Sequence, residues 1–132
     1  MTAVIFDQGA AGADPWPVEL QPIAALNPIS VNTSASGNYA VHTPAAGKAV
    51  RLWWYQMAAL PTNSAAVIAG LRFGAAGTLF GTTPLSQYGG AIAHHFRDGR
   101  AYVQGAADEV LYVNLSAAQT VYVNVETEEV VP

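Results

Sequence analysis

The sequence lacks cysteine altogether, and it is poor in charged residues. Without cysteine the chain forms no disulfide and offers no thiolate to a metal ion. Only 5 Lys and Arg and 9 Asp and Glu occur among 132 residues, which is 11% against roughly 25% in an average globular domain. The net charge of −4 disfavours non-specific binding to nucleic acid or to an anionic membrane surface, because both need basic patches.

Long apolar runs are also missing. No stretch of about 18 uninterrupted apolar residues occurs, so the sequence predicts no membrane-spanning helix. Met1 to Phe6 have neither the basic residues nor the long apolar core of a signal peptide. At 132 residues the chain has the length of one domain and is too short for two independent cores. We therefore expect a single domain that is made in a cytoplasm.

The few charged residues are unevenly distributed. From Leu20 to Gly47 there is none, counting histidine as neutral, and from Leu52 to Phe96 there is only Arg72. A solvated surface is normally rich in Lys, Glu, Arg and Asp. Either other subunits cover much of this surface, or the surface consists of small neutral residues. We favour burial by other subunits.

The first 30 residues differ from the rest in composition, with many Gly, Ala and Pro residues between Asp7 and Pro28. Four prolines oppose a regular helix there, because each removes a backbone donor and extends the preceding residue: Pro15, Pro17, Pro22 and Pro28. We expect an extended N-terminal arm over residues 1–30 and a β-sandwich domain over residues 31–132. Trp16 and Leu20 are the candidate contact residues of this arm, and a disordered leader is the alternative.

Beyond the arm, short strand-like segments alternate with turns. Strands are expected at residues 39–43, 48–60, 64–73, 91–97, 100–104, 109–115 and 119–128. Residues 64–73 could also form a helix, but Gly70 in its interior favours a strand. Asp98-Gly99 predicts a hairpin with a two-residue loop. In the last two strands, strict alternation predicts the inward-facing side chains: Leu111, Val113, Leu115, Val121, Val123 and Val125.

The segment Lys48 to Leu60 carries bulky side chains on both faces of its expected strand. A period of two puts one set of residues on one face, Val50, Leu52 and Trp54, and a second set on the other, Arg51, Trp53, Tyr55 and Met57. Such a strand is typical of the centre of a sheet that is covered on both sides. The strands and turns together predict an all-β fold, which is an antiparallel β-sandwich or jelly-roll-like barrel with an extended N-terminal arm.

Sequence patterns of enzymes are missing. There is no GxSxG motif, no phosphate-binding Gly loop with its Lys, and no HExxH motif. His94 and His95 are adjacent in an expected strand and point to opposite faces, so they do not chelate one metal ion together unless copies gather on a symmetry axis. A Ser-His-acid triad stays open, because its members are distant in sequence. The sequence predicts a non-enzymatic protein without cofactor or metal.

Three aromatic residues, Trp53, Tyr55 and Tyr88, are candidate interface residues, because exposed aromatic side chains mark binding surfaces. Trp53 and Trp54 are adjacent in a strand and face opposite sides, so at most one of them reaches a partner. We expect Trp54 in the core. For Trp53, core packing and contact with a ligand such as a sugar both remain open.

Two short segments carry a resemblance to a known group of proteins. Ala46-Gly47-Lys48-Ala49-Val50-Arg51 begins a strand, and residues 107–118 read Ala-Asp-Glu-Val-Leu-Tyr-Val-Asn-Leu-Ser-Ala-Ala before a Val-rich strand with acids over residues 121–129. With these segments in order over residues 37–130, the chain resembles small bacteriophage structural proteins of β-sandwich type, such as head decoration (cement) and fibre-tip proteins. The resemblance implies a commonly multimeric virion component without catalytic residues. The arm with Trp16 does not align with that group.

The low charge, the arm and the resemblance together predict a capsid decoration protein that binds and stabilises a phage head as a multimer. We expect a homotrimer whose partners are its own copies and a major capsid or other virion protein. It would bind neither nucleic acid nor membrane and reside in the virion after synthesis in the host cytoplasm. The alternative is the receptor- or glycan-binding head of a tail fibre, with an exposed Trp53 or Tyr88 beside Asn or Asp. A small hydrolase, the third hypothesis, needs a cleft that joins a histidine to an acid.

Overall fold

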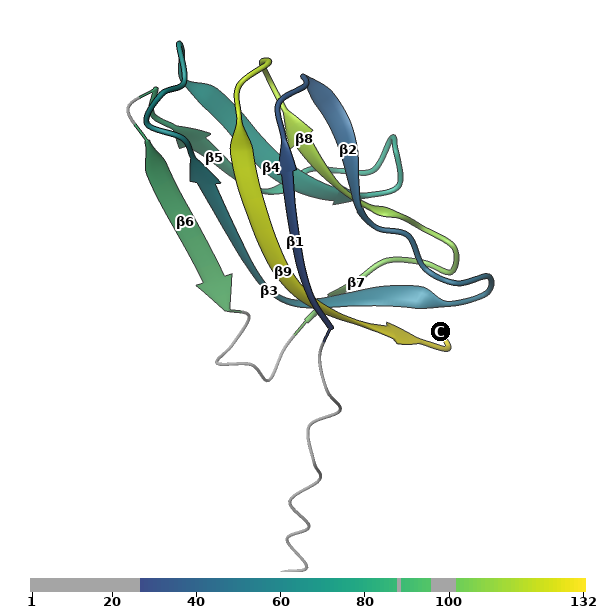
Figure 1. The fold of residues 1–132 in the computed structure, drawn as a ribbon. Coiled ribbons are helices and arrows are strands. Elements are labelled where there is room, and N and C mark those ends of the chain that lie inside the picture. The colour runs from purple at the N-terminus through teal and green to yellow at the C-terminus, as the bar shows by residue number, and fades with distance from the viewer. Residues whose placement is uncertain (1–26, 88, 96–101) are drawn as a thin grey trace, which may run out of the picture.

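A computed structural model describes residues 27–87, 89–95 and 102–132. Within these ranges the chain contains no helix, hence none long and apolar enough to cross a membrane. It forms nine β-strands (Figure 1): β1 (Asn27–Thr33), β2 (Gly37–His42), β3 (Ala49–Ala59), β4 (Val67–Phe73), β5 (Phe80–Leu85), β6 (Gly90–His95), β7 (Val103–Gln104), β8 (Leu111–Leu115) and β9 (Val121–Val130).

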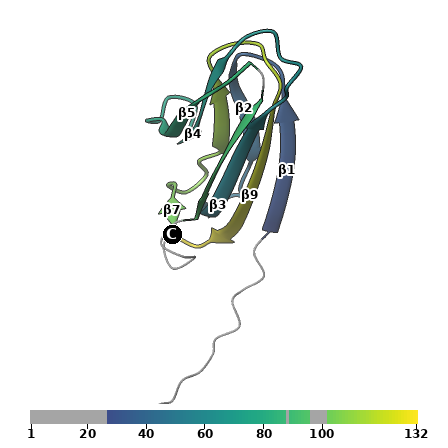
Figure 2. The same ribbon diagram turned by 90° about the vertical axis from the view of Figure 1, so that its left-hand side faces the viewer.

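The strands form two antiparallel sheets that pack against each other (Figures 1 and 2). The first sheet has the order β1-β9-β3-β6, and β7 also pairs with β3. The second sheet has the order β2-β8-β4-β5. This arrangement confirms the predicted all-β sandwich.

The strand order is that of one long antiparallel ribbon that has been rolled up. β1 pairs with β9, β2 with β8, β3 with both β6 and β7, and β4 with β5. Rolling this ribbon adds the pairs β3–β9 and β4–β8. Since β6 and β7 run in the same direction along the same edge of β3, they act as one interrupted strand. The eight resulting strands then have the winding of a jelly roll.

The core lies between the two sheets and is built mainly by the residues that alternation predicts. In β8 and β9 all side chains expected to face inward are buried, namely Leu111, Val113, Leu115, Val121, Val123 and Val125, and Thr127 is buried in addition to them. Strands β3 and β4 contribute further large buried side chains, namely Val50, Leu52, Tyr55, Met57, Val67 and Leu71. The prediction for β4 as a strand is likewise confirmed.

The longest strand departs from simple alternation. Its register to β9 shifts between Leu52 and Trp54, where β3 contains a bulge. Leu52 faces the core before the bulge, and Tyr55 and Met57 face it afterwards. The predicted faces of this strand are therefore wrong from Trp54 onward, because one extra residue reverses the alternation. Trp54, expected in the core, is half-buried and aligned with Glu126 on the outer face instead.

Three further differences from the sequence predictions concern a strand pairing, an additional strand and a strand boundary. β7 pairs with Arg51 and Leu52 of β3 instead of folding back on β6, so the predicted hairpin is wrong, and its turn residues lie outside the described residues. β5 was not expected, and it tolerates Pro84 because it is an edge strand. β1 begins at Asn27 and pairs with β9, so the boundary predicted at residue 30 falls inside a strand.

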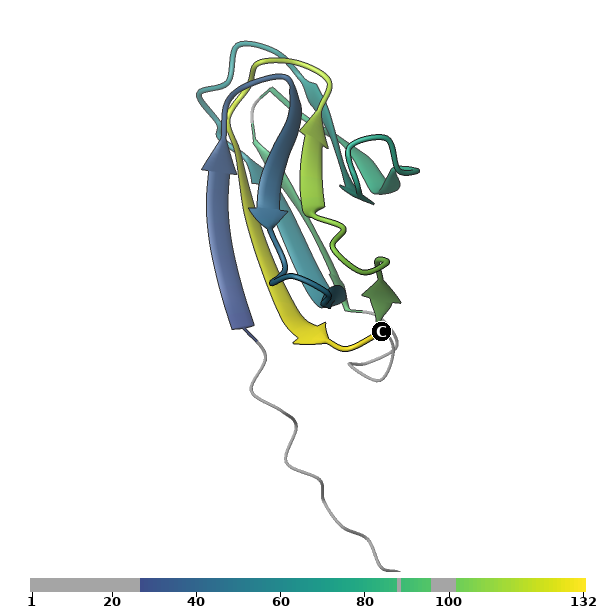
Figure 3. The same ribbon diagram turned by 90° about the vertical axis from the view of Figure 1, so that its right-hand side faces the viewer.

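The connections between strands gather at two opposite ends of the sandwich (Figures 1 and 3). Residues 34–36, 60–66, 86–87, 89 and 116–120 lie in the connections at one end, which we call the loop end. Residues 43–48 and 105–110 lie at the other end, together with the start of β1 and the C-terminus. We call this second end the terminal end.

Candidate functional site

The structure separates the sequence-predicted interface residues. Trp16, Leu20 and Tyr88 lie outside the described residues. Trp53 is half-buried on the outer face of the first sheet, whereas Tyr55 is 4% exposed and packs in the core. Burial raises the pKa of the Tyr55 hydroxyl. Tyr55 therefore offers no surface to a partner of the folded chain, and of the two described candidates only Trp53 reaches the surface.

Trp53 belongs to a cluster on the outer face of the first sheet, which we call the outer-face cluster. It consists of Arg51, Trp53, Tyr102, Gln104 and Glu128. The Trp53 indole Nε1 donates to Glu128 Oε1 at 3.1 Å, and the Trp53 and Tyr102 rings lie 5.0 Å apart. The Arg51 guanidinium lies 4.3 Å from the Tyr102 ring centre and donates to Gln104 Oε1 at 2.7 Å. Arg51 also contacts Glu128 at 3.4 Å.

These contacts hold the short strand β7 against β3. Two ladder pairs alone are a weak attachment, and the stacking of Arg51 on Tyr102 adds a cation–π contact to them. Tyr102 is 42% exposed, so one aromatic ring of the cluster stays accessible from solvent. The cluster thus stabilises the pairing of β7 with β3 and also provides an accessible aromatic surface.

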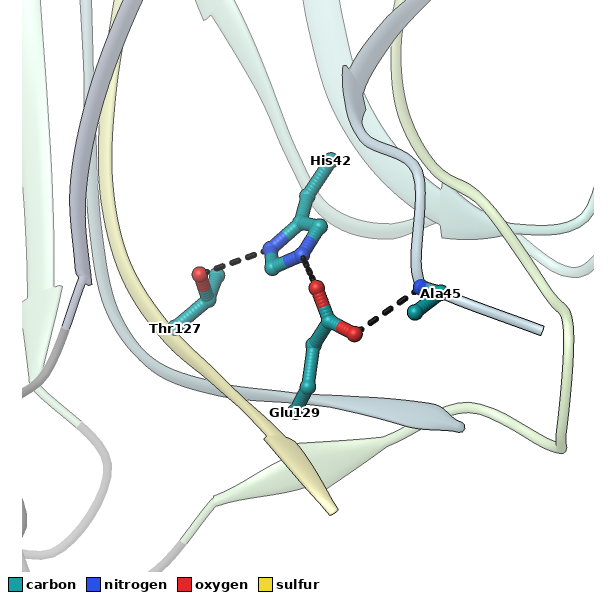
Figure 4. Close-up of polar contacts among 4 residues, drawn as sticks. All are labelled: His42, Ala45, Thr127 and Glu129. Carbon is teal, nitrogen blue, oxygen red and sulfur yellow. Dashed lines mark hydrogen bonds and ion pairs between the residues drawn. The ribbon is translucent and has the colours of Figure 1, made fainter. Parts of the chain in front are cut away.

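A second polar constellation lies inside the sandwich and joins its two sheets (Figure 4). A bulge near the end of β2 buries His42, whose Nδ1 lies 2.8 Å from the Thr127 hydroxyl. His42 Nε2 lies 2.9 Å from Glu129 Oε2. The other Glu129 oxygen accepts the Ala45 amide at 2.8 Å. The network therefore ties β2 and the connection after it to β9.

The protonation of this network follows from its partners. A carboxylate oxygen only accepts, so Nε2 of His42 carries the proton of its hydrogen bond to Glu129, while Nδ1 of the same ring bonds to the Thr127 hydroxyl. The hydrogen bonds from the His42 ring and from the Ala45 amide hold the pKa of Glu129 below its usual value. Glu129 thus stays ionised as the pH falls toward the ordinary carboxyl range.

A hydroxyl, an imidazole and a carboxylate in contact have the composition of a hydrolytic triad, but here the geometry is that of a structural network. Thr127 is fully buried and His42 is 8% exposed. A substrate carbonyl therefore cannot reach the Thr127 hydroxyl, as nucleophilic attack requires. The arrangement satisfies buried polar groups and connects the sheets, and it supports no catalytic step.

Among the described residues, no group of three His, Asp or Glu side chains could hold a metal ion. The backbone of His94 and His95 belongs to β6, where they pair with Tyr55 and Trp54. Their side chains lie outside the described part of the structure. The prediction that adjacent positions on one strand do not share a metal ion remains a prediction.

Charge separates the two ends of the sandwich. In the four connections of the loop end, the sequence contains no Lys, Arg, Asp, Glu or His. The terminal end and the strand ends beside it carry nearly all charges of the described part: Lys48, Arg51, Asp108, Glu109, Glu126, Glu128 and Glu129. Arg72, in β4, is the remaining one. The connections without charged residues thus lie together at the loop end, and most charged residues of the described part lie toward the terminal end.

Comparison with known proteins gives no assignment. No protein-family model and no curated protein matches this chain. The resemblance to small phage structural proteins therefore stays a prediction from the sequence.

Sequence reasoning missed the His42 network and the outer-face cluster. Both join residues more than 50 positions apart, such as His42 with Glu129 and Arg51 with Gln104. One signal was available for the first, since Thr127 continues the inward-facing series of β9. A polar residue at such a position needs a buried partner.

Proposed function

We propose that this protein is a non-enzymatic virion structural protein, a capsid decoration protein that binds a phage head as a multimer. The observation that carries its assembly role is the charge-free loop end. The cores of protein interfaces are depleted of charged residues, because burying an unpaired charge is costly. A surface of four connections without any charge is suited to burial against a larger partner.

The virion assignment is supported by the resemblance of residues 37–130 to small phage structural proteins. The two-sheet sandwich also suits a passive binding role, because its polar constellations are satisfied by contacts within the fold. His42 is bonded to Thr127 and Glu129, and Trp53 to Glu128. In this proposal the loop end faces the capsid, and Trp16 and Leu20 of the N-terminal region contact a neighbouring copy.

Charge placed on the loop end tests the capsid contact. Ala65 and Ala118 are exposed there, so A65E and A118E leave the core intact. We expect either variant to weaken co-sedimentation with purified phage heads by about 10-fold or more, the effect of an uncompensated buried charge. The matched control is A46E, which adds the same side chain to an exposed position of the terminal end. Equal binding of all three variants would contradict the proposal.

The contact between copies has its own test. Light scattering of the full chain should report a multimer of the 13.8 kDa protein. The double variant W16S/L20S should lower this mass, whereas A13S, a small change in the same region, should not. A multimer that is insensitive to W16S/L20S would remove the N-terminal region from the assembly.

The outer-face cluster favours a second candidate function, the glycan-binding head of a tail fibre. The observation that favours this function is Tyr102, which is 42% exposed and lies beside Trp53, with Arg51 and Glu128 as polar neighbours. Sugars stack on such aromatic rings and bond to adjacent charged groups. A glycan array probed with the wild type and Y102A decides it: a hit that Y102A loses supports this function, and silence of the wild type removes it.

A further inference from the structure

The two sheets have four edges, and three of them carry features that oppose pairing with another strand. β1 contains Pro28 and β5 contains Pro84, and proline has no amide to donate. β2 contains a bulge between Ala40 and His42. Bulges and prolines are the usual means by which edge strands avoid association.

The fourth edge, β6, lacks such protection. Its sequence, Gly-Ala-Ile-Ala-His-His, contains no proline and no Lys, Arg, Asp or Glu. It pairs with β3 over six consecutive residues without a register shift. Within the described residues no strand pairs with its other side, and it lies at the margin of the first sheet (Figure 1). β6 thus presents a straight, uncharged row of backbone groups.

The register shows which amides of β6 point outward. The Leu60 amide donates to the Thr120 carbonyl at 3.3 Å, on the β9 side of β3. Because amide directions alternate along a strand, Ala59, Met57 and Tyr55 bond toward β6. Their partners there are Gly90, Ile92 and His94. The amides that point away from β3 are therefore those of the intervening residues, Ala91, Ala93 and His95.

We propose that β6 is the edge through which two copies of this chain pair, antiparallel, across a two-fold axis at Ala93. The occupant is a second β6, because each other edge of the same protein is blocked by a proline or a bulge. Pairing centred on Ala93 sets Ala91 opposite His95 of the second copy. All three outward amides then lie in hydrogen-bonded pairs, which gives about six backbone hydrogen bonds across the axis.

The side chains around this edge fit a close approach. Ala91 is exposed, and its neighbour across the sheet, Ala58, is also small. Since β6 contains no charged residue, superposing it on its own copy sets no like charges against each other. The first sheet then continues through the axis into the second copy, which is strand addition between identical chains. This contact deepens the proposed assembly function and rests on it, and it replaces the homotrimer expected from the sequence with an assembly of an even number of chains.

The test is A91P in the full chain. Proline removes one outward amide and leaves the bonds from β6 to β3 in place. By light scattering after size exclusion, the wild type should contain an even number of 13.8 kDa chains, and A91P should halve the mass. A91S retains the amide and should keep the wild-type mass. Far-UV circular dichroism reports whether each variant is folded.

A folded A91P with the wild-type mass, or an odd number of wild-type chains, overturns the β6 contact. Amide hydrogen exchange of the wild type keeps the proposal testable even where A91P fails to fold. The Ala91 and Ala93 amides should be protected at high concentration and lose protection on dilution, and fast exchange at every concentration overturns it. Loss of mass in W16S/L20S but not in A91P would retain the assembly function and reject this contact.

Discussion

Replacing Thr127 with valine should destabilise the protein through His42, although valine has nearly the shape of threonine. Thr127 is fully buried, and its hydroxyl lies 2.8 Å from His42 Nδ1. In T127V a methyl group faces this nitrogen, while the other ring nitrogen stays bonded to Glu129. His42 is 8% exposed, so water does not replace the lost partner easily. The cost is that of leaving a buried polar atom unsatisfied.

The expected magnitude follows from that cost. An intramolecular hydrogen bond contributes about 0.5–1.5 kcal/mol net, and an unsatisfied buried donor or acceptor costs about 1–3 kcal/mol. We expect T127V to lower the free energy of unfolding by about 2 kcal/mol. Urea denaturation measures this change, and the slope of the transition should stay unchanged because the surface exposed on unfolding is the same.

A double-mutant cycle shows whether the loss passes through His42. In H42L the ring nitrogen is gone, so adding T127V should cost less than about 0.5 kcal/mol or stabilise the protein. The reasoning is refuted if T127V costs nothing in the wild type, or if it costs the same in H42L. Either result would mean that the hydroxyl acts independently of the imidazole.

Three further predictions concern single positions. Gly81 has a φ of 61°, and a Cβ there would lie 2.5 Å from the Tyr55 hydroxyl. G81A should therefore lower the free energy of unfolding by about 1–3 kcal/mol more than G47A, whose φ is also positive but whose Cβ position is open. Equal shifts in melting temperature for the two variants would contradict this. The pKa of Glu129 is lowered from 4.5, so its ionised carboxylate stabilises the folded protein above pH 4.5, and this stabilisation is lost below that pH. The difference in melting temperature between wild type and E129Q should therefore shrink as the pH falls toward about 3. A constant difference would refute the prediction. Asp108 has a φ of 64° and accepts a hydrogen bond from the Gly47 amide at 2.6 Å. Both D108A and D108G lose this hydrogen bond, but only glycine adopts the positive φ without strain, so D108A should be about 1 kcal/mol less stable than D108G in urea denaturation. Equal stability would show that backbone strain is unimportant at this position.

Strand identity and core faces were predictable wherever the residues alternate strictly. In β8 and β9 every second side chain from Leu111 to Leu115 and from Val121 to Val125 is apolar, and all of these are buried as predicted. The signal is strong because a slip of one residue would expose the whole set. The alternation within residues 64–73 predicted a strand there correctly for the same reason.

Prediction failed where the chain departs from regular alternation. No residue between Leu52 and Trp54 marks a bulge, since the bulge is imposed by pairing with β9 and not by local preference. β5 was missed because Gly81 and Pro84 are read as turn residues, although both suit an irregular edge strand. Asp98-Gly99 favours a tight turn locally, yet β7 gains its partner on β3 beside Arg51.

The candidate sites were less predictable than the fold, because they depend on pairs distant in sequence. His42 meets Glu129 across 87 positions, and only the placement of β2 opposite the end of β9 brings them together. Trp53 was recognised as a surface candidate, but its carboxylate partner Glu128 and its aromatic neighbour Tyr102 come from other strands. Composition predicted few charges and not their collection at one end.

The place of β9 in the first sheet has a consequence for how the protein is made. β9 follows all other described strands in the sequence, yet it lies between β1 and β3 and is bonded to both. Until residues 121–130 have been synthesised, β1 and β3 therefore have no strand between them, and their apolar faces stay exposed. Pairing of such distant segments makes folding slow and leaves strand edges exposed meanwhile. β1 contains no Lys, Arg, Asp or Glu and β3 contains only Arg51, so few charges oppose association of these exposed strands during this interval.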